Sequence, residues 1–96
     1  MKSSKLFIFI FSVIGVVILG IFLLLNKTYT VTFDTKGGTI YRSVEVKKGE
    51  KVNKPDDPVM MGYTFLYWQK QGDNKKYDFN EGVYNNITLE AIWEKN

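Results

Sequence analysis

Hydrophobic and polar residues divide the chain into one long apolar block and a series of short alternating segments. The block runs from Leu6 to Leu25, and only Ser12, Gly15 and Gly20 in it are not Leu, Ile, Phe or Val. At about 1.5 Å of rise per residue, a helix of this length reaches roughly 30 Å, which is the hydrocarbon thickness of a bilayer. The pattern predicts a transmembrane helix over residues 6–25.

The length of the block favours an uncleaved signal anchor over a cleaved secretory signal, whose apolar region spans about 7 to 15 residues. No small-x-small cleavage site follows the block, and the chain has no cysteine for lipid attachment. A cleaved signal is the alternative. Lys2 and Lys5 precede the block, so the positive-inside rule places residues 1–5 in the cytoplasm and the carboxyl-terminal part outside.

From Asn26 onward the chain is polar and aromatic. Residues 26–28 form a linker that reaches about 10 Å when extended, so we expect the following domain to sit against the lipid headgroups. Residues 29–96 suffice for one small domain with a marginal core. We expect the aromatic residues of this part to fill that core, with a ligand surface of Tyr and Trp as the alternative.

Period-two alternation in the domain predicts strands. Apolar and polar residues alternate over 28–33, around Val44 and Val46 and over 87–94, and we interpret residues 63–69 as a further strand. Gly37 and Gly38 supply a turn between the first two segments, which we therefore interpret as a hairpin. Segment 53–61 contains two prolines and permits at most a short helical turn; it is either a rigid connector or a PxxP docking segment.

Charge argues against a nucleic-acid partner. Of the thirteen Lys and Arg residues, two precede the apolar block, which leaves the outer domain nearly neutral against its ten acidic residues. A local basic run is interrupted by Glu45 and Glu50, and it forms either a solvated face or a contact with anionic headgroups. The run consists of Lys47, Lys48, Lys51 and Lys54.

Catalytic chemistry has little support in the residue types present. The chain has neither His nor Cys, which removes the commonest general base, thiol nucleophile and zinc ligands. The loop from Asp73 to Glu81 lacks the regular EF-hand spacing, so a calcium site there is a minor alternative. We predict no enzyme activity, no catalytic residue, no cofactor and no metal site.

A set of ordered positions in the domain resembles the Listeria–Bacteroides repeat, also called the internalin B-repeat. The resemblance covers about residues 29 to 95. The matching positions are Val31-Thr32-Phe33-Asp34, Gly37-Gly38, Val46, Gly49, Val52, Pro55, Pro58, Gly62-Tyr63-Thr64-Phe65, Trp68, Tyr77-Asp78-Phe79-Asn80, Thr88-Leu89, Ala91 and Trp93. Tyr67 and Glu90 depart from the pattern, where the family usually has glycine and often has tyrosine.

The resemblance implies a compact β-grasp-like module of bacterial surface and secreted proteins, used as a spacer or an interaction domain and without enzyme activity. The predicted fold class is therefore a single N-terminal transmembrane helix followed by a small β-rich α+β domain, β-grasp-like. We expect one such domain at 29–96.

We predict a membrane-anchored, extracytoplasmic, non-catalytic interaction or scaffolding module of a bacterial cell envelope. It would contact the bilayer through Leu6 to Leu25 and a protein partner on or in the membrane, by strand addition at a sheet edge or by docking on exposed Tyr side chains. The alternative is a structural accessory subunit that contacts its partner through the transmembrane helix. The sequence assigns neither the partner-binding residues nor the oligomeric state.

Overall fold

A computed structural model of the chain describes residues 15–21 and 26–96. Residues 15–21 are helical, and the rest of the predicted span Leu6 to Leu25 lies outside the described residues. Within the described part of the chain, no helix combines the length and the apolar character that crossing a membrane requires.

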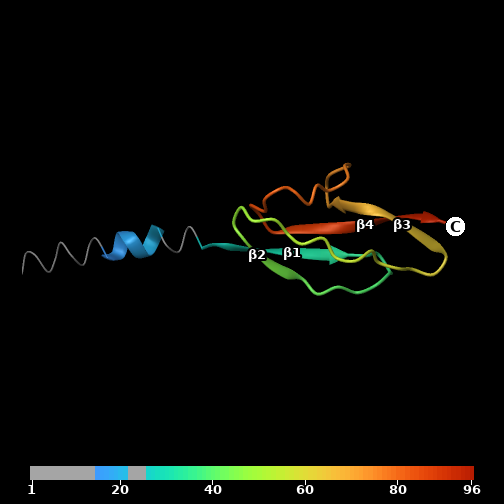
Figure 1. Cartoon of the computed structure of the whole chain (residues 1–96), viewed down its shortest axis with the longest axis horizontal. Helices are drawn as coiled ribbons and strands as arrows, with labels where there is room; N and C mark the ends of the chain where they lie inside the picture. Colours follow the sequence, from blue (N-terminus) through green and yellow to red (C-terminus); the bar gives the residue numbers. More distant parts are fainter. Residues whose placement is uncertain (1–14, 22–25) are drawn as a thin grey trace, which may run out of the picture.

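In residues 26–96, four strands form one mixed sheet (Figure 1). They are β1 (Thr28–Asp34), β2 (Val44–Lys47), β3 (Tyr63–Lys70) and β4 (Ile87–Lys95). The order across the sheet is β2-β1-β4-β3, with β1 and β4 parallel and the two outer strands antiparallel to their neighbours. Each segment predicted to be a strand is one, and β1 and β2 form the predicted antiparallel hairpin.

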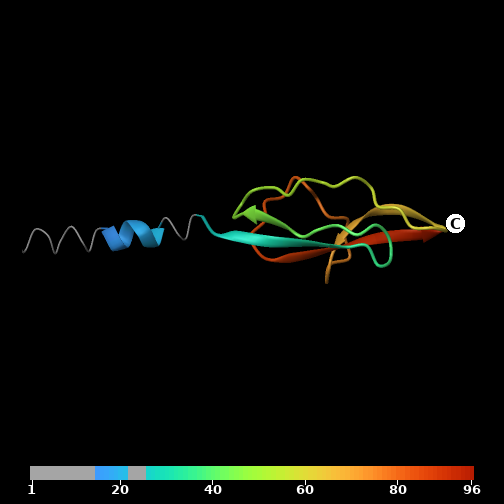
Figure 2. The ribbon, with the colours of Figure 1, turned by 90° about the horizontal axis from the view of Figure 1, so that it is seen from below.

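The predicted fold class is wrong. We expected a transmembrane helix followed by an α+β, β-grasp-like domain, but residues 26–96 form a four-stranded sheet with no helix packed on it. Segment 48–62 crosses the sheet from β2 to β3 as irregular chain (Figure 2). Pro55 and Pro58 explain this, because proline lacks the N–H that a helix needs and disfavours helical geometry in the residue before it.

The hydrophobic core lies on one face of the sheet, which we call the core face; the opposite face is the open face. Alternate residues of β1 and β4 supply the centre of the core, as expected for strands with one covered side. Segments 48–62 and 71–86 form the layer over the core face. The buried core residues are Val31, Phe33, Val46, Val52, Trp68, Tyr77, Val83, Leu89 and Ala91.

Aromatic rings fill much of this core, as predicted. Trp68 is 1% exposed and lies at the centre of the cluster. Its ring centroid is 5.1 Å from that of Phe33, 5.9 Å from that of Tyr41 and 5.5 Å from that of Phe65. These tilted and edge-to-face arrangements are the ones that the aromatic quadrupole favours.

Strand β3 contains a β-bulge. Phe65 pairs with Trp93 and Tyr67 pairs with Ile92, so Leu66 is an extra residue in β3. The bulge breaks the period of two: Phe65 and Trp68 both contact the core, although they are three positions apart. Tyr67, one of the two departures from the family pattern, consequently lies on the open face.

Candidate functional site

The two outer strands of the sheet differ in how well their free edges are covered. The outer edge of β3 is closed by the chain itself at both ends. Near its end, Tyr77 N donates to Trp68 O at 2.7 Å, and Gln69 forms a bridge with Lys76. At its start, Tyr63 N donates to Met60 O at 3.1 Å. Together with the bulge, these contacts protect β3 against pairing with another strand.

The outer edge of β2 is open. In the described part of the chain, β2 pairs on one side only, with β1. Beyond the end of β2, Lys48 N donates to Lys27 O at 2.8 Å, which continues the β1–β2 register. Because backbone groups alternate in direction along an antiparallel strand, the N–H and C=O groups of Glu45 and Lys47 point away from β1. Apart from the Lys47 carbonyl oxygen, which accepts a turn hydrogen bond from Glu50 N, this edge is available to a further strand.

A tight turn follows β2 and reverses the direction of the chain. Glu50 N donates to Lys47 O at 2.9 Å, and Gly49 has a φ of 83°. This left-handed conformation is disfavoured in other residues and fits the third position of a type II turn. The chain then runs back beside β2 as residues 50–53.

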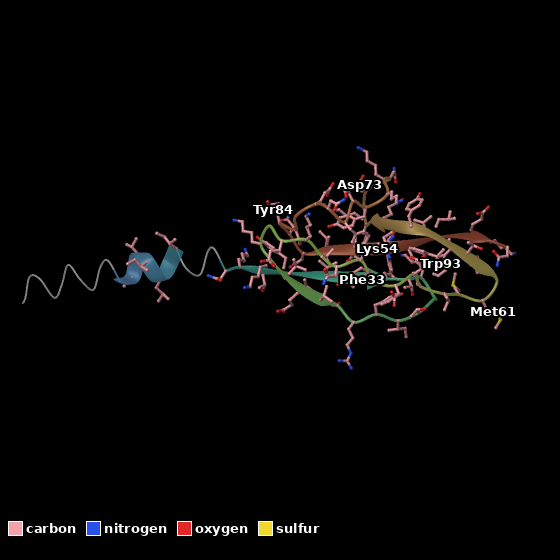
Figure 3. All side chains as sticks on the ribbon, viewed as in Figure 1. Phe33, Lys54, Met61, Asp73, Tyr84 and Trp93 are labelled. Atoms are coloured by element: carbon pink, nitrogen blue, oxygen red, sulfur yellow. The ribbon has the colours of Figure 1, made fainter. Side chains whose placement is uncertain are left out.

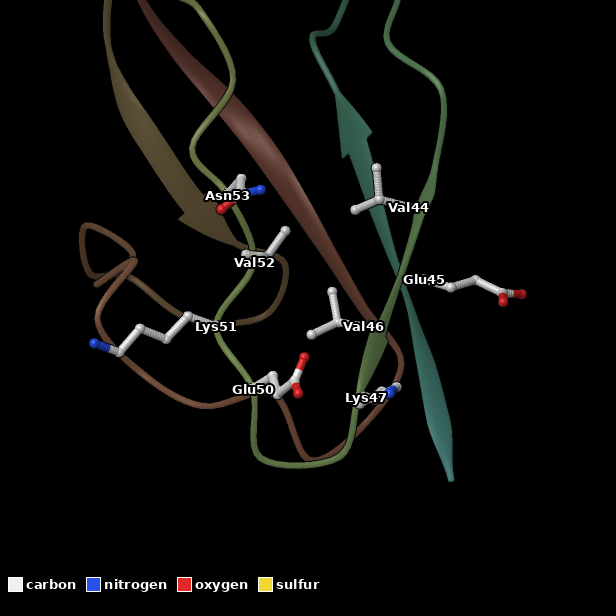
Figure 4. Close-up of a pocket in the computed structure, with 8 residues that line it drawn as sticks. All are labelled: Val44, Glu45, Val46, Lys47, Glu50, Lys51, Val52 and Asn53. Atoms are coloured by element: carbon white, nitrogen blue, oxygen red, sulfur yellow. The ribbon is translucent and has the colours of Figure 1, made fainter. Parts of the chain in front are cut away.

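A hollow of about 330 Å³ lies between β2 and residues 50–53. The side chains of Val44, Val46 and Val52 point into the space between the two segments, whereas Glu45 and Lys47 point away from it (Figure 4). Val46 and Val52 belong to the buried core, while Val44 is 39% exposed. The Glu50 side chain also points into this space, so the open edge borders a hollow of mixed character whose valine side continues into the core.

The basic run predicted from the sequence is divided between the two sides of this hollow. Lys47 and Lys48 belong to β2 and its turn, and Lys51 and Lys54 belong to segment 48–62. All four residues are exposed, and the acidic residues Glu45, Glu50 and Asp56 lie among or next to them. This arrangement agrees with the interpretation of the run as a solvated strand-and-turn face.

A second exposed surface consists of apolar side chains at the end of the domain where β4 finishes. Ile40, Val59 and Met61 are 93%, 75% and 98% exposed, and Met61 projects from this end (Figure 3). Thr39 N donates to Val59 O at 3.1 Å, which holds the two loops side by side. We call these three residues the apolar tip.

The open face of the sheet carries a small ion-pair network. Lys36 Nζ lies 3.5 Å from Asp34 Oδ2 and 3.4 Å from Glu90 Oε1. The hydrogen bond and charge of Glu90, together with the charge of Asp34, raise the pKa of the exposed Lys36 amine. Glu90, the second departure from the family pattern, thus lies on the open face.

Metal binding gains no support from the geometry. Within residues 15–21 and 26–96, no three His, Cys, Asp or Glu side chains lie close enough together to hold a metal ion. In the loop considered for calcium, Asp78 Oδ1 instead accepts a hydrogen bond from Asn80 N at 2.8 Å. The structure does not test the prediction that the chain lacks catalytic and cofactor-binding residues.

Sequence reasoning left the partner-binding residues unassigned, and the open edge of β2 was missed. The alternation around Val44 and Val46 predicts the strand but does not say which of its sides is free. That information depends on the pairing of β1 with β4, which is distant in sequence.

Comparison with known proteins gives two findings. The sequence profile of the Listeria-Bacteroides repeat domain matches residues 29–92. Two proteins of Evansella cellulosilytica are similar to 71% of this chain: one named "Putative membrane protein" is 36% identical, and one named "Putative Gly-rich membrane protein" is 34% identical. The matched region is 10% of the first relative and 8% of the second, so the chain spans about a tenth of their length.

Proposed function

The chain belongs to the Listeria-Bacteroides repeat domain family, and from this premise we propose that it is a non-catalytic interaction module of the bacterial cell envelope. The names of its two relatives support a location at a membrane. The observation that carries the proposal is the difference between the two sheet edges, one closed by the chain itself and one largely open beside a hollow lined by valine and charged side chains.

The topology within this proposal is a single pass, with the amino end in the cytoplasm and the repeat domain outside. It rests on the uncharged composition of residues 6–25 and on the two lysines that precede them. Because the chain has no cysteine, a single introduced thiol reports its own location. In intact cells, Ser43→Cys should react with an impermeant thiol reagent and Ser3→Cys should not. The reverse pattern would show that the topology is wrong.

The binding mechanism that we propose is strand addition at the outer edge of β2. An extended segment of a protein on or in the membrane would form backbone hydrogen bonds with Glu45 and Lys47. Its alternate side chains would cover Val44 and enter the hollow beside Val52. Backbone pairing supplies affinity in this mode, and the hollow supplies side-chain selectivity.

Proline substitution tests this mechanism because its effect depends on the direction of the replaced N–H group. Glu45→Pro removes an N–H that points away from β1, so the β1–β2 ladder should remain. Val46→Pro removes an N–H that points toward β1 and serves as the matched control, because it should destabilise the domain. A photocrosslinking residue at Lys51, on the rim of the hollow, measures occupancy in cells that express the full chain.

We expect capture of one protein from position 51 and its loss in Glu45→Pro, while the thermal unfolding midpoint of this variant stays close to that of the parent chain. The same crosslinker at Met61 monitors the apolar tip. If the partner is captured from position 61 but not from position 51, and this capture persists in Glu45→Pro, the contact lies at the apolar tip. This result would refute strand addition.

The alternative is an accessory subunit whose contact lies in residues 6–25. The small residues Ser12, Gly15 and Gly20 are the sequence feature that favours it, since small residues allow helices to approach closely. Replacing residues 6–25 with an unrelated apolar segment should preserve capture from position 51 if β2 makes the contact. Under the alternative, the exchange should abolish association with the partner.

A further inference from the structure

We propose that the strand that pairs with β2 is the β2 of a second copy of this chain, in an antiparallel register centred on Val46. This inference rests on the proposed function, because it names the occupant of the same open edge. Three properties of residues 44–47 support it: the direction of their backbone groups, their charges and their apolar side chains.

The backbone of β2 is self-complementary in this register. Antiparallel pairing about Val46 places Glu45 of one copy opposite Lys47 of the other, and the reverse. Both residues direct their N–H and C=O groups outward, so the two pairs can exchange hydrogen bonds in both directions. Lys47 O already accepts from Glu50 N at 2.9 Å, but a carbonyl oxygen has a second lone pair.

The charges of β2 select this register over its neighbours. Centred on Val46, each Glu45 carboxylate faces a Lys47 amine across the new strand pair, on the side turned away from the core (Figure 4). A register centred on Glu45 would place two carboxylates opposite each other, and one centred on Lys47 would place two amines opposite each other. Opposite charges directly across a strand pair are favourable, and like charges are not.

The apolar side chains of β2 also match. Val46 of one copy would lie beside Val46 of the other, in the more closely spaced kind of antiparallel pair. Val44, which is 39% exposed, would be covered by the second copy together with the valine side of the hollow. The two sheets would then join into one continuous sheet with β3 at each outer edge, and β3 is the edge that the chain itself protects.

Short strands limit the strength of this association. A stable interface buries roughly 1,200 to 2,000 Å² in total, and a pair of four-residue strands offers much less. Holding both copies at one membrane surface raises their effective concentration, which compensates for a weak contact. We therefore expect pairing between full chains in a membrane and little pairing in dilute solution.

Disulfide crosslinking tests the register directly, because the chain contains no cysteine. In the proposed pair, the Cα atoms of residue 45 and of residue 47 in the other copy are about 5.5 Å apart, which suits a disulfide. Residues 45 and 45, or 47 and 47, lie on diagonals of about 7 to 8 Å, which is too far. Full chains carrying Glu45→Cys and Lys47→Cys, co-expressed and mildly oxidised in the cell membrane, should form several-fold more dimer than either variant alone.

Charge reversal provides the second test, in full chains with a photocrosslinking residue at Val44. Glu45→Lys and Lys47→Glu should each reduce the dimer several-fold, because each places like charges opposite one another. The double variant E45K/K47E recreates two opposite-charge pairs and should restore the dimer. Both positions point away from the core, so the comparison does not depend on core packing.

The outcomes separate this inference from the proposed function. Equal crosslinking of the mixed and single cysteine variants, or a double charge variant that stays monomeric, overturns self-pairing. If Glu45→Pro still abolishes capture of a different protein from position 51, strand addition stands and only its occupant is wrong. If neither capture nor dimer depends on β2, both proposals fail.

Discussion

Tyr77 connects the covering layer to the core and makes the stability of the domain sensitive to alkaline pH. The residue is 8% exposed, and its ring meets that of Phe79 edge-to-face, with ring centroids 5.0 Å apart. Burial, followed by the charges of Glu81 and Asp78, raises the pKa of the Tyr77 phenol above its ordinary value of 10.0. Burial raises the pKa of Tyr41 in the same way.

The pKa values of the Tyr77 and Tyr41 phenols are both higher in the folded domain than in the unfolded chain, so the folded domain holds these protons more tightly. The resulting stability is complete below about pH 10 and is lost as the pH rises through the pKa values of the folded state. Lys36 acts in the same direction, because its acidic neighbours favour the protonated amine and raise its pKa.

We predict that Tyr77→Phe flattens the decline of stability above pH 10 and changes stability little at pH 7. The substitution removes the ionising hydroxyl and keeps the ring that packs on Phe79. Thermal unfolding of the full chain, measured from pH 7 to pH 11, checks the prediction. A decline as steep as that of the parent chain would show that the Tyr77 phenol does not contribute to it.

At the scale of the elements, the bulge in β3 explains how a strand with irregular alternation still has a single buried face. Removing Leu66 leaves Phe65 and Tyr67 adjacent, opposite the adjacent residues Trp93 and Ile92 of β4. The remaining residues of β3 then alternate regularly, with Phe65 and Trp68 still on the core face.

Deletion of Leu66 should therefore preserve the fold and change the free energy of unfolding by only about 1 kcal/mol. Deletion of Ala91 is the matched control: β4 has no extra residue, so one half of the strand would turn its core residues outward and folding should be lost. Tryptophan fluorescence during urea unfolding distinguishes the two results. If the Leu66 deletion also unfolds the chain, the bulge itself is required for the sheet to form.

Element by element, local pattern predicted the strands and the irregular connector at 53–61, but not the bulge in β3. The alternation at Val44 and Val46 was sufficient to predict β2, since one buried face repeats every second residue. The α+β class that the family resemblance implied was wrong, whereas the prolines of segment 53–61 correctly indicated a connector with at most a short helical turn. Leu66 escaped prediction because nothing local marks it as the residue without a partner.

At the scale of the whole molecule, the stability of the sheet depends on β4, the last strand that the structure describes. β4 lies between β1 and β3, and it contributes Leu89 and Ala91 to the core. Residues 35–86 must close a long loop before β1 and β4 can pair, so folding depends on contacts between distant parts of the sequence.

We predict that a chain ending before Ile87 does not fold, although it retains β1, β2 and β3. Removing only Lys95 and Asn96 is the control; it removes the last residue of β4 with its pairing to Tyr63 and the bond from Asn96 N to Gly62 O, and should leave the rest of the sheet intact. Circular dichroism of the two shortened chains checks both expectations. A stable hairpin of β1 and β2 in the shorter chain would contradict the dependence on β4.

The pairing of β1 with β4 also limits how much of the candidate site could be predicted from the sequence. The motifs from Val31 to Trp93 were enough to predict the family, and the profile match at residues 29–92 confirms that prediction. The open edge at Glu45 and Lys47 could not be predicted, because β2 is an edge strand only once β4 has paired with the other side of β1.

The parallel pairing of β1 with β4 also determines how the domain responds to mechanical tension. The chain enters β1 at one end of the domain and leaves β4 at the opposite end (Figure 1). A pull on the two termini slides these central strands past each other, along their length. All the backbone bonds of the register from Val31–Ile87 to Asp34–Glu90 then bear the force together, instead of opening one after another. The repeat is thus arranged to transmit a pulling force along its long direction before it unfolds.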